Sequence, residues 1–211
     1  MVRRTKAEAQ ETRERIIDAA ERVFHDKGVS RTSLNDIAKE AGVTRGAIYW
    51  HFKNKHDVFA AMFERQRLPM ESMANRAEDP NETDPLGKFR EAMIYVLCQT
   101  VLDPGRRRVF EIMFHKCEFT AETDPLMERQ REAFLDGSER TRRTFRNAIA
   151  RGQLPASLDI ERAVVQLHVQ MTGLLYVWLL LPEAFDLQAE AANFVDCYIN
   201  SLTHCPSIAG P

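Results

Sequence analysis

The stretch Thr32–Lys55, TSLNDIAKEAGVTRGAIYWHFKNK, most constrains what this chain can fold into. From Leu34 onward its first half has apolar residues at i, i+3, i+4 and i+7, which predicts a helix with one buried face. Ser33 and Asp36 have the spacing of a capping box, so this helix is expected to begin there. Gly42 suits the left-handed residue that ends a helix. The pattern predicts a short helix followed by a tight turn.

After this turn, Thr44 can cap a second short helix. That helix is expected to bury Ala47, Ile48 and Phe52. It leaves a second set of residues facing outward: Arg45, Gly46, Tyr49, Trp50 and His51. Exposed aromatic rings beside basic groups gain little unless a partner docks on them. The arrangement is typical of a helix-turn-helix, in which the second helix reads DNA.

Each outward side chain suggests a contact with DNA. Arg45 can bond O6 and N7 of a guanine together, so it is expected to read a base. Tyr49 and Lys55 suit phosphate contacts, which set register. Trp50 either packs on a thymine methyl or sugar, or seals the core of the small domain. His51 either donates to a phosphate or caps its helix.

The charge distribution agrees with this interpretation. Residues 1–55 hold 12 basic and 8 acidic residues, a net charge of +4. The remainder holds 29 − 12 = 17 basic and 31 − 8 = 23 acidic residues, a net charge of −6. A basic segment on an acidic remainder fits a protein that touches phosphates at one end, although ordinary surface variation gives the same imbalance.

Other functional classes find little support. Four scattered cysteines, Cys98, Cys117, Cys197 and Cys205, are expected to be reduced, and the histidines lack metal-ligand spacing. No nucleotide-binding or hydrolase motif occurs, so we expect no enzyme and no cofactor. The charged N-terminus lacks a signal-peptide core, and the longest apolar run, Leu174–Leu181, is too short to span a bilayer. We therefore expect a cytoplasmic protein without membrane contact.

Helical spacing and capping residues predict about nine helices and an all-α fold. Besides the helix-turn-helix, helices are expected at about 5–27, from 54 onward, and at 85–102, 106–118, 125–151, 159–181 and 187–204. Pro69 predicts a kink or break near 65–69, and the polar segment 77–84 is a candidate linker. The predicted domains are a DNA-binding domain at 1–55 and a ligand-binding and dimerisation domain at 56–211.

The last two predicted helices carry wide apolar faces. The first has a stripe through Leu174, Val177, Trp178 and Leu181, and the second a face around Tyr198. Surplus apolar surface on helices favours a two-fold dimer, while the alternative is that both faces fill the core of one chain.

Several motifs together identify a family resemblance. The stretch AGVTRGAIYWHFKNK, the N-terminal VRRTKAEAQETRERIIDAAERVF, and the pieces HKCEF, RGQLP and WLLLPEAFDL are similar to those of TetR-family transcriptional regulators. They resemble in particular the AcrR- and TtgR-type repressors of multidrug efflux operons. The resemblance implies an Ω-shaped all-helical homodimer that binds double-stranded operator DNA, dimerises through its last two helices and binds a small-molecule inducer. The candidate DNA-binding residues are Ser33, Thr44, Arg45, Gly46, Tyr49, Trp50, His51 and Lys55.

Residues of mixed polarity on the later helices suggest where an effector binds. His168 begins a stripe at i, i+3, i+4 and i+7 on a helix too apolar to be exposed. The candidate ligand-binding residues are Met70, Phe89, Met93, Val96, Phe110, Met113, Phe114, Phe134, Gly137, His168, Met171, Thr172, Leu175 and Tyr176. Such a lining, rich in aromatic and Met side chains, suits a hydrophobic or aromatic effector, although an ordinary core with a satisfied histidine gives the same pattern.

The sequence thus predicts a ligand-responsive repressor that binds a pseudo-palindromic operator as a dimer and controls a multidrug efflux operon. Two alternatives stay open. One is a regulator of the same type that senses a lipid or secondary metabolite. The other is a small-molecule carrier or helical enzyme whose basic segment is incidental.

Overall fold

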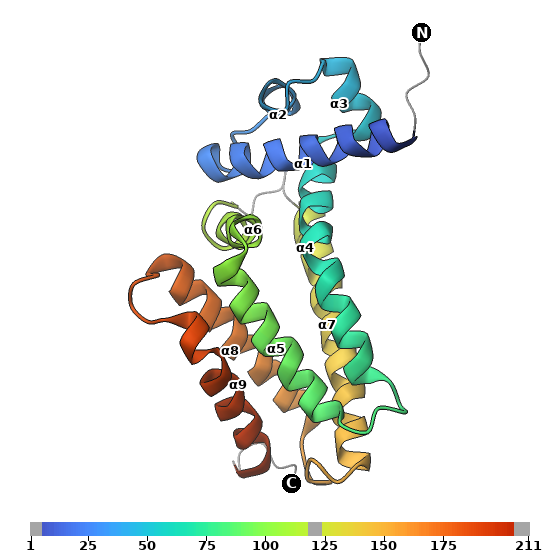
Figure 1. The fold of residues 1–211 in the computed structure, drawn as a ribbon, viewed down its shortest axis with the longest axis vertical. Helices are drawn as coiled ribbons and strands as arrows, with labels where there is room; N and C mark the ends of the chain where they lie inside the picture. The colour runs from blue at the N-terminus through green and yellow to red at the C-terminus, as the bar shows by residue number, and fades with distance from the viewer. Residues whose placement is uncertain (1–5, 118–123, 205–211) are drawn as a thin grey trace. The chain divides into compact units, whose positions relative to one another are not determined.

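The structure is a computed structural model that describes residues 6–117 and 124–204, without the side chains of residues 69–71, 74, 124 and 125. This part of the chain forms nine helices and no strand, which confirms the all-α prediction (Figure 1). The helices are α1 Lys6–Lys27, α2 Leu34–Glu40, α3 Arg45–His51, α4 Lys55–Glu78, α5 Pro85–Leu102, α6 Pro104–His115, α7 Asp124–Ala150, α8 Ile160–Leu180 and α9 Leu187–His204.

Capping residues account for most helix ends. Asp84 accepts a hydrogen bond from the backbone of Gly87 at the start of the helix predicted at 85–102, and Asp159 accepts one from Arg162. The helix predicted at 106–118 instead begins at Pro104, because proline at the first helical position needs no N–H partner. The first residue of the helix predicted at about 5–27 lies outside the described residues.

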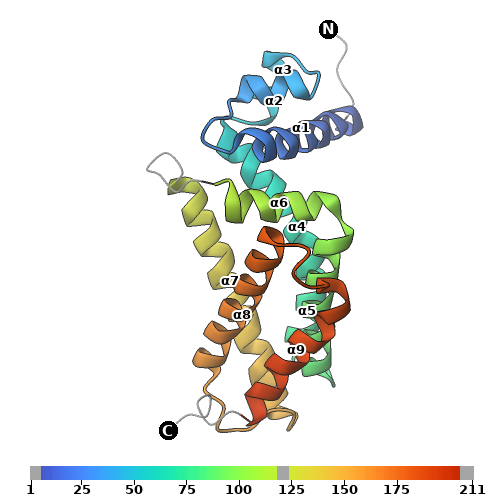
Figure 2. The ribbon, with the colours of Figure 1, turned by 90° about the vertical axis from the view of Figure 1, so that its left-hand side faces the viewer.

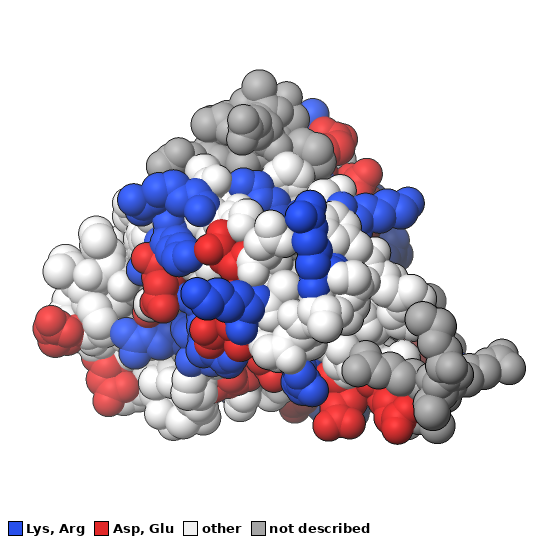
Figure 3. Space-filling model, turned by 90° about the horizontal axis from the view of Figure 1, so that it is seen from above, with Lys and Arg blue, Asp and Glu red and all other residues white. Residues whose placement is uncertain are grey.

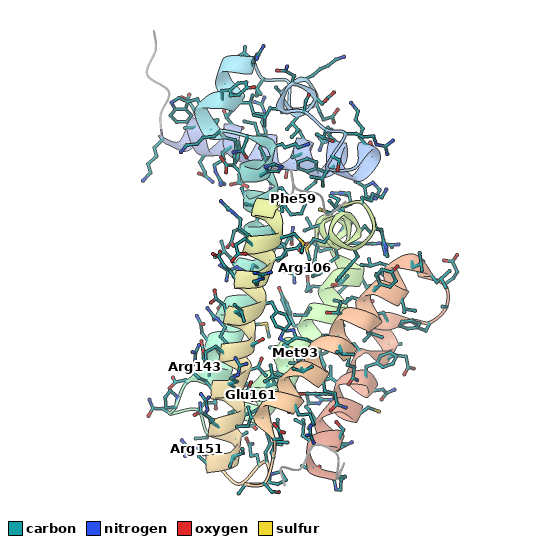
Figure 4. The ribbon with its side chains drawn as sticks, turned by 180° about the vertical axis from the view of Figure 1, so that it is seen from behind. Phe59, Met93, Arg106, Arg143, Arg151 and Glu161 are labelled. Atoms are coloured by element: carbon teal, nitrogen blue, oxygen red, sulfur yellow. The ribbon has the colours of Figure 1, made fainter. Side chains whose placement is uncertain are left out.

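Of the kink or break predicted near Pro69, the break is wrong, because α4 is one continuous helix through this segment. The kink stays a prediction. An internal proline removes one backbone donor, and helices tolerate this where other contacts stabilise the turn. Arg106 of α6 is buried, and its guanidinium donates to the carbonyl of Gln66 at 3.3 Å, in the turn before the proline (Figure 4).

The chain divides into two compact units. Unit 1 comprises residues 1–67 and 105–131, and unit 2 comprises residues 68–104 and 132–211. The chain therefore passes between the units within α4 and α7 and at the start of α6. The candidate linker 77–84 lies inside unit 2, where Arg151 donates to the carbonyl of Pro80 and Gln153 donates to Asp84. Polar composition alone does not distinguish such an anchored loop from a linker.

Unit 1 is built on the buried face of α1. Ile16, Ile17 and Phe24 are fully buried, and they pack with Ile37 of α2 and Ile48 of α3. The amino-terminal part of α4 and the helix α6 complete this core. The helix-turn-helix therefore rests on a cluster that also contains residues of α4 and α6.

Unit 2 is a helical bundle in which α9 packs on α5 and α8 (Figure 2). The ring of Phe89 lies edge-on to Phe145 at 5.2 Å, and Tyr198 donates its hydroxyl to the carbonyl of Ala163 at 2.7 Å. The face around Tyr198, one of the two proposed for dimerisation, is therefore largely core.

The helix α8 keeps a large apolar surface outside this core. Val165, Val169, Tyr176 and Leu180 are exposed and follow one another at helical spacing. By length and composition α8 is apolar enough to cross a membrane, a test that the core helices of many water-soluble proteins also pass. The unbroken apolar run Leu174–Leu181 is shorter than the apolar helix, because isolated polar residues such as His168 and Gln170 separate it from the apolar residues earlier in α8.

Candidate nucleic-acid interface and effector site

The first helix of the helix-turn-helix begins at the predicted capping box. The Ser33 hydroxyl accepts from the backbone N–H of Asp36 at 3.2 Å, and the Asp36 carboxylate accepts from the backbone N–H of Ser33 at 3.0 Å. Lys27 of α1 also donates to Asp36 at 2.8 Å. Hydrogen bonds from Lys27 and Ser33 hold the pKa of the Asp36 carboxyl well below its usual range. Asp36 therefore stays ionised and ties α2 to α1.

The turn has the geometry that its sequence predicts. Gly42 has a φ of +62°, which a residue with a side chain rarely adopts, and Val43 donates to the carbonyl of Ala38 at 3.0 Å. Thr44 then caps α3 by accepting from the N–H of Ala47 at 3.2 Å. Since Ile48 is fully buried, the orientation of α3 about its axis is fixed.

The opposite face of α3 carries the predicted recognition residues. Tyr49 is 47% exposed and Trp50 is 72% exposed, so Trp50 does not seal the core. The Arg45 guanidinium lies over the Tyr49 ring at 5.6 Å, and the rings of Trp50 and His51 are 4.5 Å apart. Gly46 is exposed between them and allows close backbone approach. These groups form one exposed surface that is both basic and aromatic.

Lys55 has a second set of partners besides the phosphate predicted for it. This half-buried residue begins α4, and its ammonium donates to the carbonyls of Val29 and Ser30 at 3.1 and 2.9 Å. An ammonium has three donors, so one donor is left for a DNA phosphate. The phosphate contact itself stays a prediction.

The upper face of the molecule in Figure 3 carries Lys and Arg side chains with Asp and Glu among them. Several basic groups of unit 1 are paired, such as Arg22 with Glu40 at 2.8 Å. Arg45 by contrast contacts a neutral ring. Its charge is therefore available to a phosphate or a base edge.

In unit 2 the structure brings together two of the candidate effector residues, Phe134 of α7 and His168 of α8. Their ring centroids are 4.2 Å apart. His168 Nε2 also lies 3.0 Å from the hydroxyl of Ser138, a residue that the sequence analysis missed. Ser138 lies one helical turn after Phe134, and this spacing was the available signal.

The hydrogen bonds of Ser138 determine the tautomer of the neutral His168 imidazole, that is, which ring nitrogen carries the proton. Ser138 donates its one proton to the carbonyl of Phe134 at 2.7 Å, so its oxygen must accept from His168 Nε2. Nδ1 is then the bare acceptor nitrogen. Burial lowers the pKa of His168, and the positive charge of Arg142 lowers it further. The site therefore presents a neutral imidazole with an open acceptor near an exposed aromatic ring.

The remaining candidates in unit 2 are divided between core and surface. Phe89, Val96 and Leu175 are buried, whereas Met93, Gly137 and Met171 are half-buried and Thr172 and Tyr176 are exposed. Phe89 packs on Phe145 and Tyr198, as expected for a core ring. The stripe from His168 therefore does not face one environment throughout.

The candidates on α6 belong to unit 1. Phe110 and Phe114 are half-buried and stack with 6.2 Å between their ring centroids, and Met113 packs against the core of that unit. The side chain of Met70 lies outside those that the structure describes. Among the described residues no group of His, Cys, Asp and Glu side chains could hold a metal ion.

The supported, capped and outward-facing α3 defines a helix-turn-helix DNA-binding protein. Two family models match the chain. The model of bacterial regulatory proteins of the tetR family matches residues 16–62, and that of the C-terminal region of MAATS-type transcriptional repressors matches residues 84–204. The chain belongs to the TetR family of transcriptional regulators, whose members are DNA-binding proteins and not enzymes.

Individual relatives cover nearly the whole chain. The transcriptional regulator TtgR of Pseudomonas putida is 45% identical over 208 residues, 99% of either chain. The structure of NalD, the secondary repressor of the MexAB-OprM multidrug efflux pump in Pseudomonas aeruginosa, matches with a TM-score of 0.84 and 33% identity. That match covers 95% of this chain and 100% of NalD. A SmeT–triclosan complex matches with a TM-score of 0.85 and 36% identity, over 95% of each chain.

Proposed function

We propose that this chain is a ligand-responsive repressor that binds a pseudo-palindromic operator as a dimer and controls a multidrug efflux operon. The observation that carries the DNA-binding part is the exposed face of α3, where Arg45, Tyr49 and Trp50 project from a helix fixed by Ile48. Operator control follows from membership of a repressor family. Efflux control is supported by NalD, a repressor of such a pump.

Within this proposal the DNA contacts divide into two kinds. Arg45 reads a guanine edge, while Ser33, Thr44, Tyr49, His51 and Lys55 contact phosphates or fix the register. Gly46 lets the backbone come close, and Trp50 packs on a thymine methyl or a sugar. Residues 1–55 are the DNA-binding part and residues 56–211 the regulatory part, which acts in the cytoplasm beside its operator.

We propose that the dimer forms through α8 and α9. The apolar residues for this interface are on α8, where Val165, Val169, Tyr176 and Leu180 are exposed in one stripe. On α9 the corresponding exposed positions are small or polar, for example Asn193 and Cys197. A two-fold contact along α8 would remove the α8 stripe from water.

Dimer formation can be tested directly. Sedimentation of Val169→Glu should give a monomer, because the substitution places a charge in the centre of the apolar stripe. Leu102→Glu, at an exposed position on α5, is the matched control and should stay dimeric. A dimeric Val169→Glu protein would place the interface elsewhere.

The effector in this proposal is a hydrophobic or aromatic small molecule. In unit 2 it would stack on Phe134 and donate a hydrogen bond to His168 Nδ1. The binding of triclosan by SmeT supports a ligand that combines aromatic rings with a hydroxyl donor. The contribution predicted for Met70 is part of the same proposal.

Footprinting tests the function as a whole. The purified protein should protect a pseudo-palindrome upstream of an efflux operon or of its own gene. Adding triclosan or another hydrophobic phenol should remove the protection. Protection that no member of a hydrophobic panel relieves would refute ligand control, and absence of any protected site would refute the repressor.

A further inference from the structure

The loop at residues 28–32 connects α1 to the helix-turn-helix and is held by bonds of its own. Gly28, with a φ of +80°, ends α1 and donates to the carbonyl of Phe24 at 2.9 Å. The Thr32 hydroxyl donates back to the carbonyl of Gly28 at 2.8 Å. Because α2 follows directly, this loop sets where α2 begins relative to α1.

The next hydrogen bond of the helix is missing at this point. If α1 continued, the N–H of Val29 would donate to the carbonyl of His25, four residues earlier. It donates instead to the main-chain carbonyl of Lys116 at 3.2 Å. The carbonyl of His25 accepts from the ammonium of the same Lys116 at 2.7 Å. One residue just beyond α6 thus supplies both partners of the bond that α1 gives up.

The other side of the loop is bound by α4. Lys55 donates to the carbonyls of Val29 and Ser30. Val29 is therefore bound through its N–H to the end of α6 and through its carbonyl to the start of α4, while its side chain is fully buried in the core of unit 1. The loop is a junction at which three helices meet.

We propose that Lys116 is a positioning residue for DNA binding, which completes the end of α1 and ties α6 to the helix-turn-helix. Lys116 is the lysine of the HKCEF motif at 115–119, and these two contacts with α1 and Val29 are the role that we assign to it. A displacement of α6 withdraws both partners from α1 together, and this loosens the connection to α2. This regulatory consequence rests on the proposed function, whereas the positioning role rests only on the contacts within unit 1.

The role differs measurably from a DNA contact. A lysine bound to a phosphate contributes about 0.9 to the slope of log affinity against log salt, and a positioning lysine contributes nothing to it. Lys116→Met keeps the aliphatic stem and removes the ammonium. We expect operator affinity to fall by about fivefold, the worth of one ordinary hydrogen bond, with the salt slope unchanged. Lys116→Arg, which can still donate, should recover most of the affinity.

Lys88→Met is the matched control, because Lys88 pairs with Glu91 on α5 in unit 2. It should bind the operator as the unmodified protein does. Operator affinity of Lys116→Met within twofold of that of the control would overturn the proposal. A salt slope lowered by about 0.9 would make Lys116 a phosphate contact and would overturn it equally.

Amide hydrogen exchange tests the junction without DNA. In the unmodified protein the Val29 amide should exchange more slowly than the amides of Ser30 and Arg31, and Lys116→Met should accelerate it. Equal exchange at these three amides would overturn the proposal even if the variant did not fold. If the unmodified protein bound no operator, the proposed function would fail and this measurement would still decide the role of Lys116.

Discussion

Glu21 of α1 and Arg65 of α4 form an ion pair in which the carboxylate is buried and the guanidinium is partly exposed. Arg65 also lies 2.7 Å from Asp18, and Arg108 of α6 lies 3.7 Å from Glu21. Burial raises the pKa of Glu21 above its usual value, against the opposing effect of Arg65. The Glu21 carboxylate is therefore approached from α4 and from α6, so that three helices of unit 1 meet around it. Burial makes the charge of this carboxylate costly in free energy.

This asymmetry predicts that the two partners differ in their effect on stability. Arg65→Met leaves a buried charge poorly compensated. Because Arg65 is partly exposed, we expect the loss in free energy of unfolding to be about 2 kcal/mol, the worth of a hydrogen bond to a charged group. Glu21→Gln removes the charge along with the contact and should cost much less. Denaturant unfolding of both variants and of the double variant measures this. Equal losses of unfolding free energy for the two single variants would contradict a buried Glu21 carboxylate that depends on Arg65 for compensation.

The pH dependence of Arg65→Met has a definite sign. A carboxyl whose pKa is higher in the folded protein stabilises the fold at low pH, and this stabilisation is lost as the pH rises through the folded-state pKa. Without Arg65 that pKa rises further. The difference in free energy of unfolding between the unmodified protein and Arg65→Met should therefore become smaller as the solution is acidified from neutral pH, provided both proteins remain folded.

Arg45→Ala tests base readout. Loss of a bidentate contact with guanine should cost about 1–3 kcal/mol on the operator and relax the preference at one base pair. Binding to random DNA should change much less. Gel shifts with operator and random duplexes make the comparison, and equal losses on both would show that Arg45 only contacts phosphates.

Lys55→Met tests the remaining donor of that ammonium. If this donor contacts a phosphate, the variant should lose affinity for operator and random DNA alike, and its salt slope should fall by about 0.9. The parallel measurement on Lys116→Met should show no such fall. An unchanged slope for Lys55→Met would leave Lys55 with the loop carbonyls as its only role.

His168 should make the stability of the protein depend on pH in a predictable window. Because burial lowers its pKa below 6.5 in the folded state, it stabilises the fold above that pH, and the contribution is lost as the pH falls toward the folded-state pKa. His168→Gln keeps a donor for Ser138 and does not titrate. Thermal unfolding at about pH 7.5 and about pH 5.5 should show less decline for the variant than for the unmodified protein. Equal declines would contradict a buried neutral imidazole.

The sequence predicts the helix-turn-helix well because its determinants are local. The capping box at Ser33, the turn at Gly42 and the cap at Thr44 each depend on residues within one or two helical turns, and all three are present. The outward orientation of Trp50 follows from the burial of Ile48 on the opposite face of the same helix.

Features that depend on distant residues are not predictable in this way. Lys55 donates hydrogen bonds to two carbonyls about 25 residues earlier in the chain, and Lys116 forms hydrogen bonds with residues about 90 positions earlier. No local pattern marks these pairs. The face around Tyr198 is apolar enough for either a core or an interface, and only its packing in unit 2 decides between them.

In the proposed function this protein stays bound to its operator until an effector binds. Fluorescence anisotropy measures this directly. A labelled upstream DNA fragment is titrated with protein in the absence and in the presence of a hydrophobic phenol. The protein should bind the fragment tightly and in a salt-dependent way, and the phenol should weaken this binding by about 5–150-fold, the usual range of allosteric coupling. Binding that is identical with and without every phenol tested would contradict it.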